Sequence, residues 1–344
     1  MFSKLYVELD TDFIKYVYAK AVGKKASIKK WGSISMPGGT FINGKVENKE
    51  EFIKLLSEIK KELSVRSCIA YLSLSDGSII TRPLELPILG EKDIEKHLNL
   101  EVEQYLPINQ NSYQVSFKII EKGIAGDEAG SSIMIAAASK ENIQGILECF
   151  DRCRLHARVL DVYPNNVCRL LNNLEEDNIA VIDIDRRGIN IIITEIRSFY
   201  MHSYLPFNME SVFDSYRKDC SISAKEFHNR YYYNEFDFEG INSDTAAAEE
   251  GLEAVLSGML AQTSRYLDYF NSRHFGKTVD RVYVIGEYGM LKGLKQIMSY
   301  SFRTAVTIGM KPIKLLNNKG NSPIEGVQMS YYSLLGMMLR GMKL

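Results

Sequence analysis

The chain has 344 residues and a formal net charge of -1, with 45% hydrophobic and 25% charged residues. This length favours two lobes over a single compact core, and the composition is typical of a folded globular protein. The balanced charge excludes a global basic field for nucleic acid, and the short basic pairs Lys24-Lys25 and Lys29-Lys30 are interpreted as solvated surface.

The chain shows no sign of a metal site or of a membrane anchor. Its five cysteines have no CxxC spacing and its five histidines are scattered, so neither metal ligands nor catalytic residues are predicted. The N-terminus does not resemble a signal peptide, and no window approaches about 18 uninterrupted apolar residues. We expect a cytoplasmic protein without direct membrane insertion, which only a partner would hold at a membrane.

The first half of the chain alternates between strands and helices. A helix over 48–63 has Phe52, Leu55, Leu56 and Ile59 at helical spacing, behind a predicted Asn48 cap. Strands are predicted over 5–9, 13–21, 27–35, 69–74, 113–121, 133–138 and 157–162, with an extended segment over 79–86. Further helices are predicted over 91–105 and 140–152, and a polar loop over 123–132.

The second half begins with strands over 179–183, 189–196 and 199–205. The polar, tyrosine-rich stretch 206–240 receives no fold assignment. A long helix over 245–273, a strand over 282–285 and helices over 291–298 and 331–340 complete the prediction.

A repeat relates the two halves. Segments 7–14 and 181–190 each leave an apolar strand, turn with carboxylates and enter another strand. Such a repeat predicts a duplicated α/β fold with a cleft between two lobes. We assign 1–78 and 160–178 to the first-lobe core, 79–159 to an inserted α/β module, 179–205 and 275–344 to the second-lobe core, and 206–274 to a second-lobe subdomain.

Several motifs carry a resemblance to a known family. An extended arm, Arg82-Pro83-Leu84-Glu85-Leu86-Pro87, precedes a helix that ends in Glu103-Gln104-Tyr105-Leu106-Pro107. With segments 136–141, 160–162, 264–270 and 334–340, this pattern resembles the PilM family of type IV pilus assembly proteins, which belongs to the actin-like ATPase superfamily and is related to the cell-division protein FtsA. The resemblance implies an actin-like, ribonuclease H-like duplicated fold.

The chain departs from this family in its nucleotide loops. The family's first loop reads Asp-Ile-Gly, its second Asp-x-Gly, and its third carries consecutive glycines. By resemblance, the positions of the nucleotide cleft are Glu8, Asp10, Thr11 and Lys15 in the first loop, Asp183 and Asp185 in the second, and Gly286 and Gly289 in the third. Asp10 and Asp185 therefore stand where the family has glycines.

These two substitutions oppose phosphate binding. Glycine lets the backbone approach a phosphate, whereas aspartate fills that space with a like charge that costs roughly 4 kcal/mol at about 4 Å. A divalent cation among Glu8, Asp10, Asp183 and Asp185 would offset part of this cost. The acidic residues fit either the relic of a nucleotide site or ordinary polar turns, and the glycines fit either an adenosine pocket or a plain turn.

The resemblance also implies a partner. In the family, a groove between the first-lobe core and the inserted module receives the N-terminal peptide of the membrane protein PilN. The residues expected to shape this groove are Arg82, Leu86, Tyr105 and Pro107. The alternative is that the arm over 84–87 and the helix over 91–105 only pack the module. The expected function is a scaffold of the pilus platform that contacts motor or platform proteins, without a required cofactor. The alternative is an actin-like ATPase or switch that binds ATP and Mg²⁺.

Overall fold

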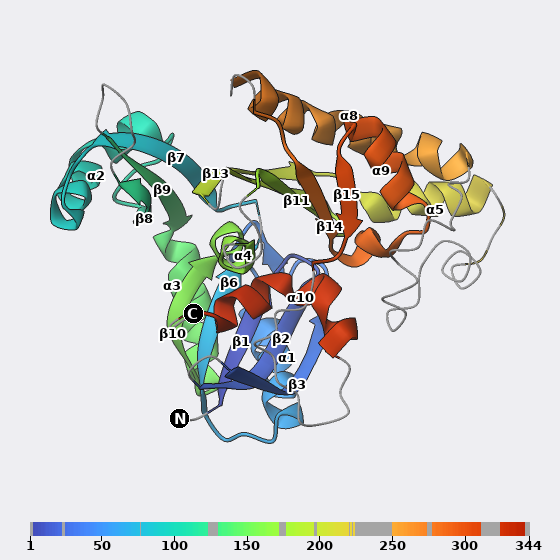
Figure 1. Ribbon diagram of the computed structural model, residues 1–344. Helices are drawn as coiled ribbons and strands as arrows, with labels where there is room; N and C mark the ends of the chain where they lie inside the picture. The colour runs from blue at the N-terminus through green and yellow to red at the C-terminus, as the bar shows by residue number, and fades with distance from the viewer. Residues whose placement is uncertain are drawn as a thin grey trace. The chain divides into compact units, whose positions relative to one another are not determined.

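The structure is a computed structural model that describes residues 3–22, 25–75, 77–122, 130–171, 177–195, 198–219, 221, 223, 250–273, 277–310 and 324–340. The chain divides into two compact units (Figure 1). The first comprises Met1–Leu170, Leu315–Asn317 and Ser333–Leu344, and the second comprises Leu171–Lys314 and Asn318–Tyr332.

The first unit is built on a five-stranded sheet in the order β10-β6-β1-β2-β3 (Figure 1). Strand β2 is antiparallel to both β1 and β3, whereas β6 is parallel to both β1 and β10. Parallel neighbours need crossover connections, which the intervening helices provide. The strands are β1 (Lys4–Leu9), β2 (Phe13–Val22), β3 (Lys25–Ser35), β6 (Cys68–Leu74) and β10 (Leu155–Val162), which confirms the prediction for this half.

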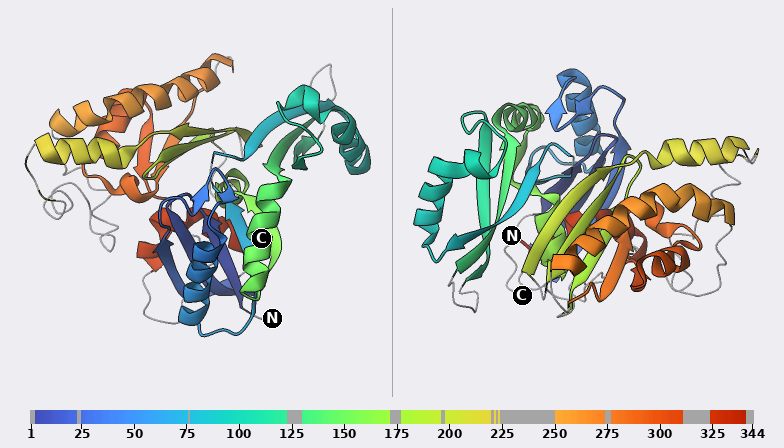
Figure 2. Two further views of the ribbon diagram at one scale, coloured as in Figure 1. Left: turned by 180° about the vertical axis from the view of Figure 1, so that it is seen from behind. Right: turned by 90° about the horizontal axis from the view of Figure 1, so that it is seen from above.

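One face of this sheet is covered by helices α1 (Lys49–Glu62) and α3 (Lys140–Arg152), seen from behind in Figure 2. Asn48 caps α1 by accepting a hydrogen bond from the Glu51 N–H, as predicted. The buried residues of α1 are those that helical spacing predicts, and they join the sheet in one apolar core. A short hairpin of β4 (Phe41–Ile42) and β5 (Lys45–Val46) belongs to the same unit.

The opposite face carries α4 (Tyr163–Leu171), which was not predicted, and the last turns of α10 (Ile324–Met338). Ser73 of β6 and Ser333 of α10 are hydrogen-bonded at 2.9 Å. A Cβ at Gly336 would lie 1.9 Å from the Asn166 carbonyl oxygen, so only glycine allows this approach. These contacts explain why Ser333–Leu344 groups with the first unit, although the sequence predicts 275–344 as part of the second-lobe core.

The inserted segment forms a three-stranded antiparallel sheet in the order β7-β9-β8, with α2 (Glu91–Tyr105) against it (Figure 2). Its strands are β7 (Ile80–Pro87), β8 (Tyr113–Lys122) and β9 (Gly130–Ser139). Apolar residues of α2 and β9, with Leu86 of β7, form a separate core. The predicted loop over 123–132 is wrong at its end, because Gly130, Ser131 and Ser132 already pair with β7.

The second unit has a five-stranded sheet in the order β13-β12-β11-β14-β15. Strand β12 is antiparallel to β11 and β13, whereas β14 is parallel to β11 and β15. The strands are β11 (Ile179–Ile184), β12 (Gly188–Glu195), β13 (Ser198–Pro206), β14 (Arg281–Ile285) and β15 (Ala305–Ile308). The last of these was not predicted.

The helices of the second unit depart more from the sequence prediction. Helix α5 (Met209–Asp219) lies in the stretch that received no assignment, and α8 (Glu250–Arg273) matches the long predicted helix, whose residues 245–249 lie outside the described ones. A 3-10 helix, η1 (Glu287–Met290), precedes α9 (Leu294–Phe302), which begins later than predicted. Gly293, with φ of 80°, immediately precedes α9.

The two sheets repeat one arrangement. Strands β1 and β11 each pair antiparallel with the next strand in sequence and parallel with a later one. The registers place Leu9 opposite Ile14 and Ile184 opposite Ile189. By this register Glu8 corresponds to Asp183, Asp10 to Asp185 and Lys15 to Asn190. The predicted duplicated α/β fold is confirmed.

Candidate functional site

The turn between β1 and β2 uses its acidic residues to hold its own backbone. The Asp10 N–H donates to the Phe13 carbonyl over 3.1 Å, and the Asp12 N–H donates to Oδ1 of Asp10 over 3.1 Å. Asp10 is therefore an Asx-turn residue. Thr11 lies between them and is partly exposed.

Glu8 and Lys15 face each other across β1 and β2. They are paired in the register, both are buried, and Nζ of Lys15 lies 3.5 Å from Oε1 of Glu8. In a buried ion pair, each charge is stabilised by its partner. The ammonium of Lys15, which the family resemblance aligns with a phosphate loop, is thus matched by a carboxylate of the same hairpin.

The corresponding turn in the second unit is tied to the third loop. The Asp185 N–H donates to the Gly188 carbonyl over 3.0 Å, which repeats the bond made by Asp10. Oδ1 of Asp185 also accepts a hydrogen bond from the Glu287 N–H at 3.2 Å. Asp185 therefore uses a backbone donor of the third loop, the kind of group that binds phosphate in nucleotide sites.

Two glycines of the third loop serve its close packing. Gly286 has φ of 91°, and a Cβ there would lie 2.2 Å from Oδ1 of the buried Asp183. The Gly289 N–H donates to the Gly286 carbonyl over 3.2 Å, and Gly289 is buried. The structure thus brings Asp183, Asp185 and Gly286 together in one unit, and glycine at 286 is required by the backbone itself.

The residues between these glycines are engaged with neighbouring elements. Arg186 makes a two-pronged ion pair with Glu287, with N–O distances of 2.9 and 3.0 Å. The Tyr288 ring stacks on Phe213 of α5, with centroids 5.3 Å apart and planes 7° apart, and burial raises the pKa of Tyr288. Sequence reasoning missed these pairs. The sequence feature that could have indicated them is the presence of Glu287 and Tyr288 where the family has consecutive glycines.

The four residues predicted for the partner site differ in their exposure. Nη1 of Arg82 donates to the Tyr105 carbonyl, at the C-terminal end of α2 where a cation is favoured. The Tyr105 hydroxyl lies 3.0 Å from Nε2 of His97. Arg82 and Pro107 are exposed, whereas Leu86 is buried in the core of the inserted module and lines no surface.

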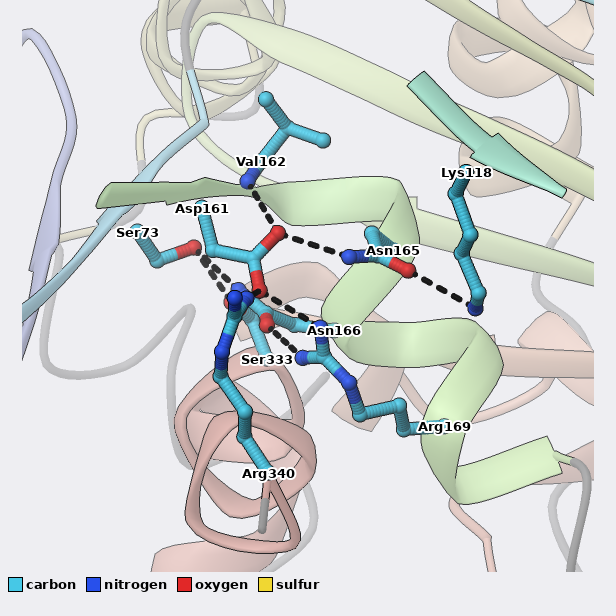
Figure 3. A network of polar contacts seen from close by, with 9 residues as sticks. All are labelled: Ser73, Lys118, Asp161, Val162, Asn165, Asn166, Arg169, Ser333 and Arg340. Carbon is cyan, nitrogen blue, oxygen red and sulfur yellow. Dashed lines mark hydrogen bonds and ion pairs between the residues drawn. The ribbon is translucent and has the colours of Figure 1, made fainter. Parts of the chain in front are cut away.

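A polar network that sequence reasoning missed joins distant parts of the first unit (Figure 3). Asp161, at the end of β10, lies 2.6 Å from Nη2 of Arg169 and 2.7 Å from Nη1 of Arg340. Burial opposes ionisation of Asp161, but the Arg169 charge and hydrogen bonds, including one from Asn165, outweigh it and lower the pKa of the carboxyl.

The same network reaches the inserted module. Nζ of Lys118 in β8 donates to Asn165 over 3.0 Å, and Asn166 donates to Ser73 over 2.9 Å (Figure 3). Arg169 also donates to Asn166. Helix α4 therefore connects the module, the central sheet and the end of α10.

The described residues offer neither a metal-binding cluster nor a membrane-spanning helix. Among them, no three His, Cys, Asp or Glu side chains gather as ligands of one metal ion would. Over the same part of the chain, every helix is too short or too polar to cross a bilayer.

Comparison with known proteins shows the family and the fold of the chain. A family model described as type IV pilus assembly protein PilM matches residues 7–342. A solved PilM-PilN type IV pilus biogenesis complex is similar at 19% identity and a TM-score of 0.79, covering 99% of both chains. The ethanolamine utilization protein EutJ from Carboxydothermus hydrogenoformans is similar at 14% identity and a TM-score of 0.53, covering 99% of this chain and 90% of that one. The chain therefore has the actin-like fold and belongs to the family of type IV pilus assembly protein PilM.

Proposed function

We propose that this protein is a scaffold on the cytoplasmic face of the inner membrane, where it binds the N-terminal peptide of a PilN-like membrane protein. The family match over residues 7–342 carries the proposal. The likeness over 99% of the chain to a structure of PilM with PilN supports the choice of partner. Further contacts with pilus motor or platform proteins are part of the proposed role.

The inserted module offers the features that an extended peptide needs. Strands β7 and β8 are the edges of its three-stranded sheet, and a peptide can add to such an edge through main-chain hydrogen bonds. Arg82 of β7 and Pro107 beyond α2 are exposed, and Tyr105 is half-buried between them in the chain. We assign these three residues to the peptide site and Leu86 to its support from within the core.

We further propose that the nucleotide loops have lost their ATPase role. Lys15 is matched by Glu8, Asp185 occupies the Glu287 N–H, and Arg186 is paired with Glu287. Two like-charge contacts of roughly 4 kcal/mol each would remove the free energy of micromolar binding, which is about 8 kcal/mol.

Capture of the purified chain by an immobilised N-terminal peptide of the PilN-like protein from the same genome tests the scaffold role. The folded chain is expected to bind the peptide and not a scrambled peptide of the same composition. Equal retention on both, or on neither, would refute the proposal.

A further inference from the structure

Basic side chains gather at one end of the first unit. Parallel strands β1, β6 and β10 all begin there, and the hairpin of β2 and β3 and the helices α1 and α3 bring further residues to the same end. We call this surface the basic pole and define it as Lys4, Lys20, Lys29, Lys61, Arg66 and Arg154.

Strand pairing and hydrogen bonds hold these segments together. Lys4 pairs with Ala19 in the register, beside Lys20, and Ala19 pairs with Ile28, beside Lys29. The Cys68 N–H at the start of β6 donates to the Arg154 carbonyl. Nζ of Lys30 bonds the Glu62 carbonyl at the end of α1, which joins the β3 side of the pole to the helix side.

An open cavity of about 480 Å³ lies within the basic pole. Its walls include Lys20 and Lys29, the hydroxyl-bearing Ser3, Ser67 and Tyr18, and the partly exposed Ile69. Ammonium and hydroxyl groups are the donors that a phosphate oxygen accepts from. The cavity therefore combines phosphate-binding groups with an apolar wall.

Helix capping does not account for this surface. Lys61 follows the ordinary preference for cations in the last turn of a helix. Lys20 and Lys29 lie on strands, where no helix dipole favours them. Two carboxylates lie nearby, Glu62, which accepts a hydrogen bond from the Tyr16 hydroxyl, and Asp151, which lies 3.5 Å from Nδ1 of His156, and the six cations of the pole outnumber these two.

We propose that the basic pole binds the anionic phospholipid headgroups of the membrane surface, with one headgroup phosphate in the cavity. The inference rests on the proposed location at the membrane and adds a direct contact to the one made through the partner. An end of the first unit that carries six Lys and Arg residues is suited to a flat anionic surface on that side. No segment needs to enter the bilayer.

Vesicle sedimentation with the full chain tests this proposal, using phosphatidylcholine vesicles with and without phosphatidylglycerol. The wild type is expected to sediment only with the anionic vesicles, and added NaCl should release it. The triple variant Lys20→Gln, Lys29→Gln, Arg66→Gln should bind about a hundredfold more weakly, from the contribution of each cation near an anionic surface.

The matched control changes the same amount of charge elsewhere on the first unit. Lys45→Gln, Lys54→Gln, Lys96→Gln alters three exposed lysines outside the basic pole and should retain binding. Equal loss in both triple variants, equal binding to neutral vesicles, or no binding by the wild type would overturn the proposal. Thermal unfolding confirms that each variant is folded, and capture by the PilN-like peptide, scored separately, reports on the scaffold role alone.

Discussion

Gly286 and Asp183 are packed so closely that a Cβ on the glycine would lie 2.2 Å from Oδ1 of the aspartate. The same Cβ would lie 2.6 Å from the Ile184 carbonyl oxygen, which is backbone and has little freedom to move. The second and third loops of this unit are thus fitted to each other, and the hydrogen bond between Asp185 and the Glu287 N–H adds to that fit.

Gly286→Ala is expected to lower the free energy of unfolding by about 2–4 kcal/mol, because it adds both a clash and an unfavourable positive φ. Gly145→Ala is the matched control. Gly145 lies within α3 with nothing within 4 Å of its added Cβ, so alanine should stabilise by about 0.5–1 kcal/mol. Urea unfolding of both variants measures the difference, and a harmless Gly286→Ala would show that the loops are not closely fitted.

Asp161→Asn is expected to destabilise the first unit by about 2–3 kcal/mol, because it leaves Arg169, largely buried, without its carboxylate partner. Glu148→Gln, which removes an exposed ion pair with Lys49, should cost no more than about 1 kcal/mol. Chemical unfolding compares them, and equal effects would contradict the role given to the network in Figure 3.

The Asp161 network also predicts a pH dependence. Because the folded-state pKa of Asp161 is lowered, its contribution is fully present above the unfolded value of about 3.9 and is lost as pH falls through the folded pKa. Wild-type stability should therefore decline below about pH 4 more steeply than that of Asp161→Asn. Parallel curves for the two proteins would exclude this linkage.

The burial of His202 predicts a second pH dependence of stability, at higher pH than that of Asp161. Burial lowers the pKa of His202 to about 4, and the imidazole is hydrogen-bonded to Asn190 at 3.0 Å. The unfolded chain binds the proton more readily, so stability is lost as pH falls from about 6.5 toward 4. His202→Gln should reduce the slope of stability against pH in that interval. An unchanged slope would contradict the account of this residue.

The peptide site gives the fifth test. Tyr105→Ala and Pro107→Ala should each weaken binding of the PilN-like peptide by about tenfold, the effect of losing one important contact. Lys96→Gln on the outer side of α2 is an exposed control that should bind as the wild type does. Calorimetry measures all three, and wild-type affinity in both alanine variants would remove these residues from the site.

Much of the fold could be predicted, because hydrophobic periodicity and the residues that flank each element indicate the same helices and strands. Helices α2 and α3 have the bounds that periodicity and flanking residues predict, and Asn48 makes the cap expected of it. Helix α4 could not be found in this way. Its polar Asn165 and Asn166 interrupt the apolar pattern, and their reason is a network that includes Arg340, far away in the sequence.

The candidate sites were also predicted only in part. The positions of Asp10 and Asp185 follow from the repeat, but their hydrogen bonds depend on loop geometry that no spacing reveals. Lys29 and Lys30 are exposed, as the sequence predicts, but the sequence alone does not show that β3 meets the end of α1, where Lys30 donates to the Glu62 carbonyl. The family resemblance placed Leu86 at the peptide groove, yet strand alternation turns its side chain into the module core.

Titration calorimetry of the PilN-like peptide into the full chain, with and without ATP and Mg²⁺, tests the central claim most directly. If the chain is a scaffold whose nucleotide loops are bonded to each other, the peptide should bind saturably and with the same affinity in both conditions. ATP alone should give no heat of binding. Submicromolar ATP binding, or a peptide affinity that changes with ATP, would identify a nucleotide switch and contradict the account.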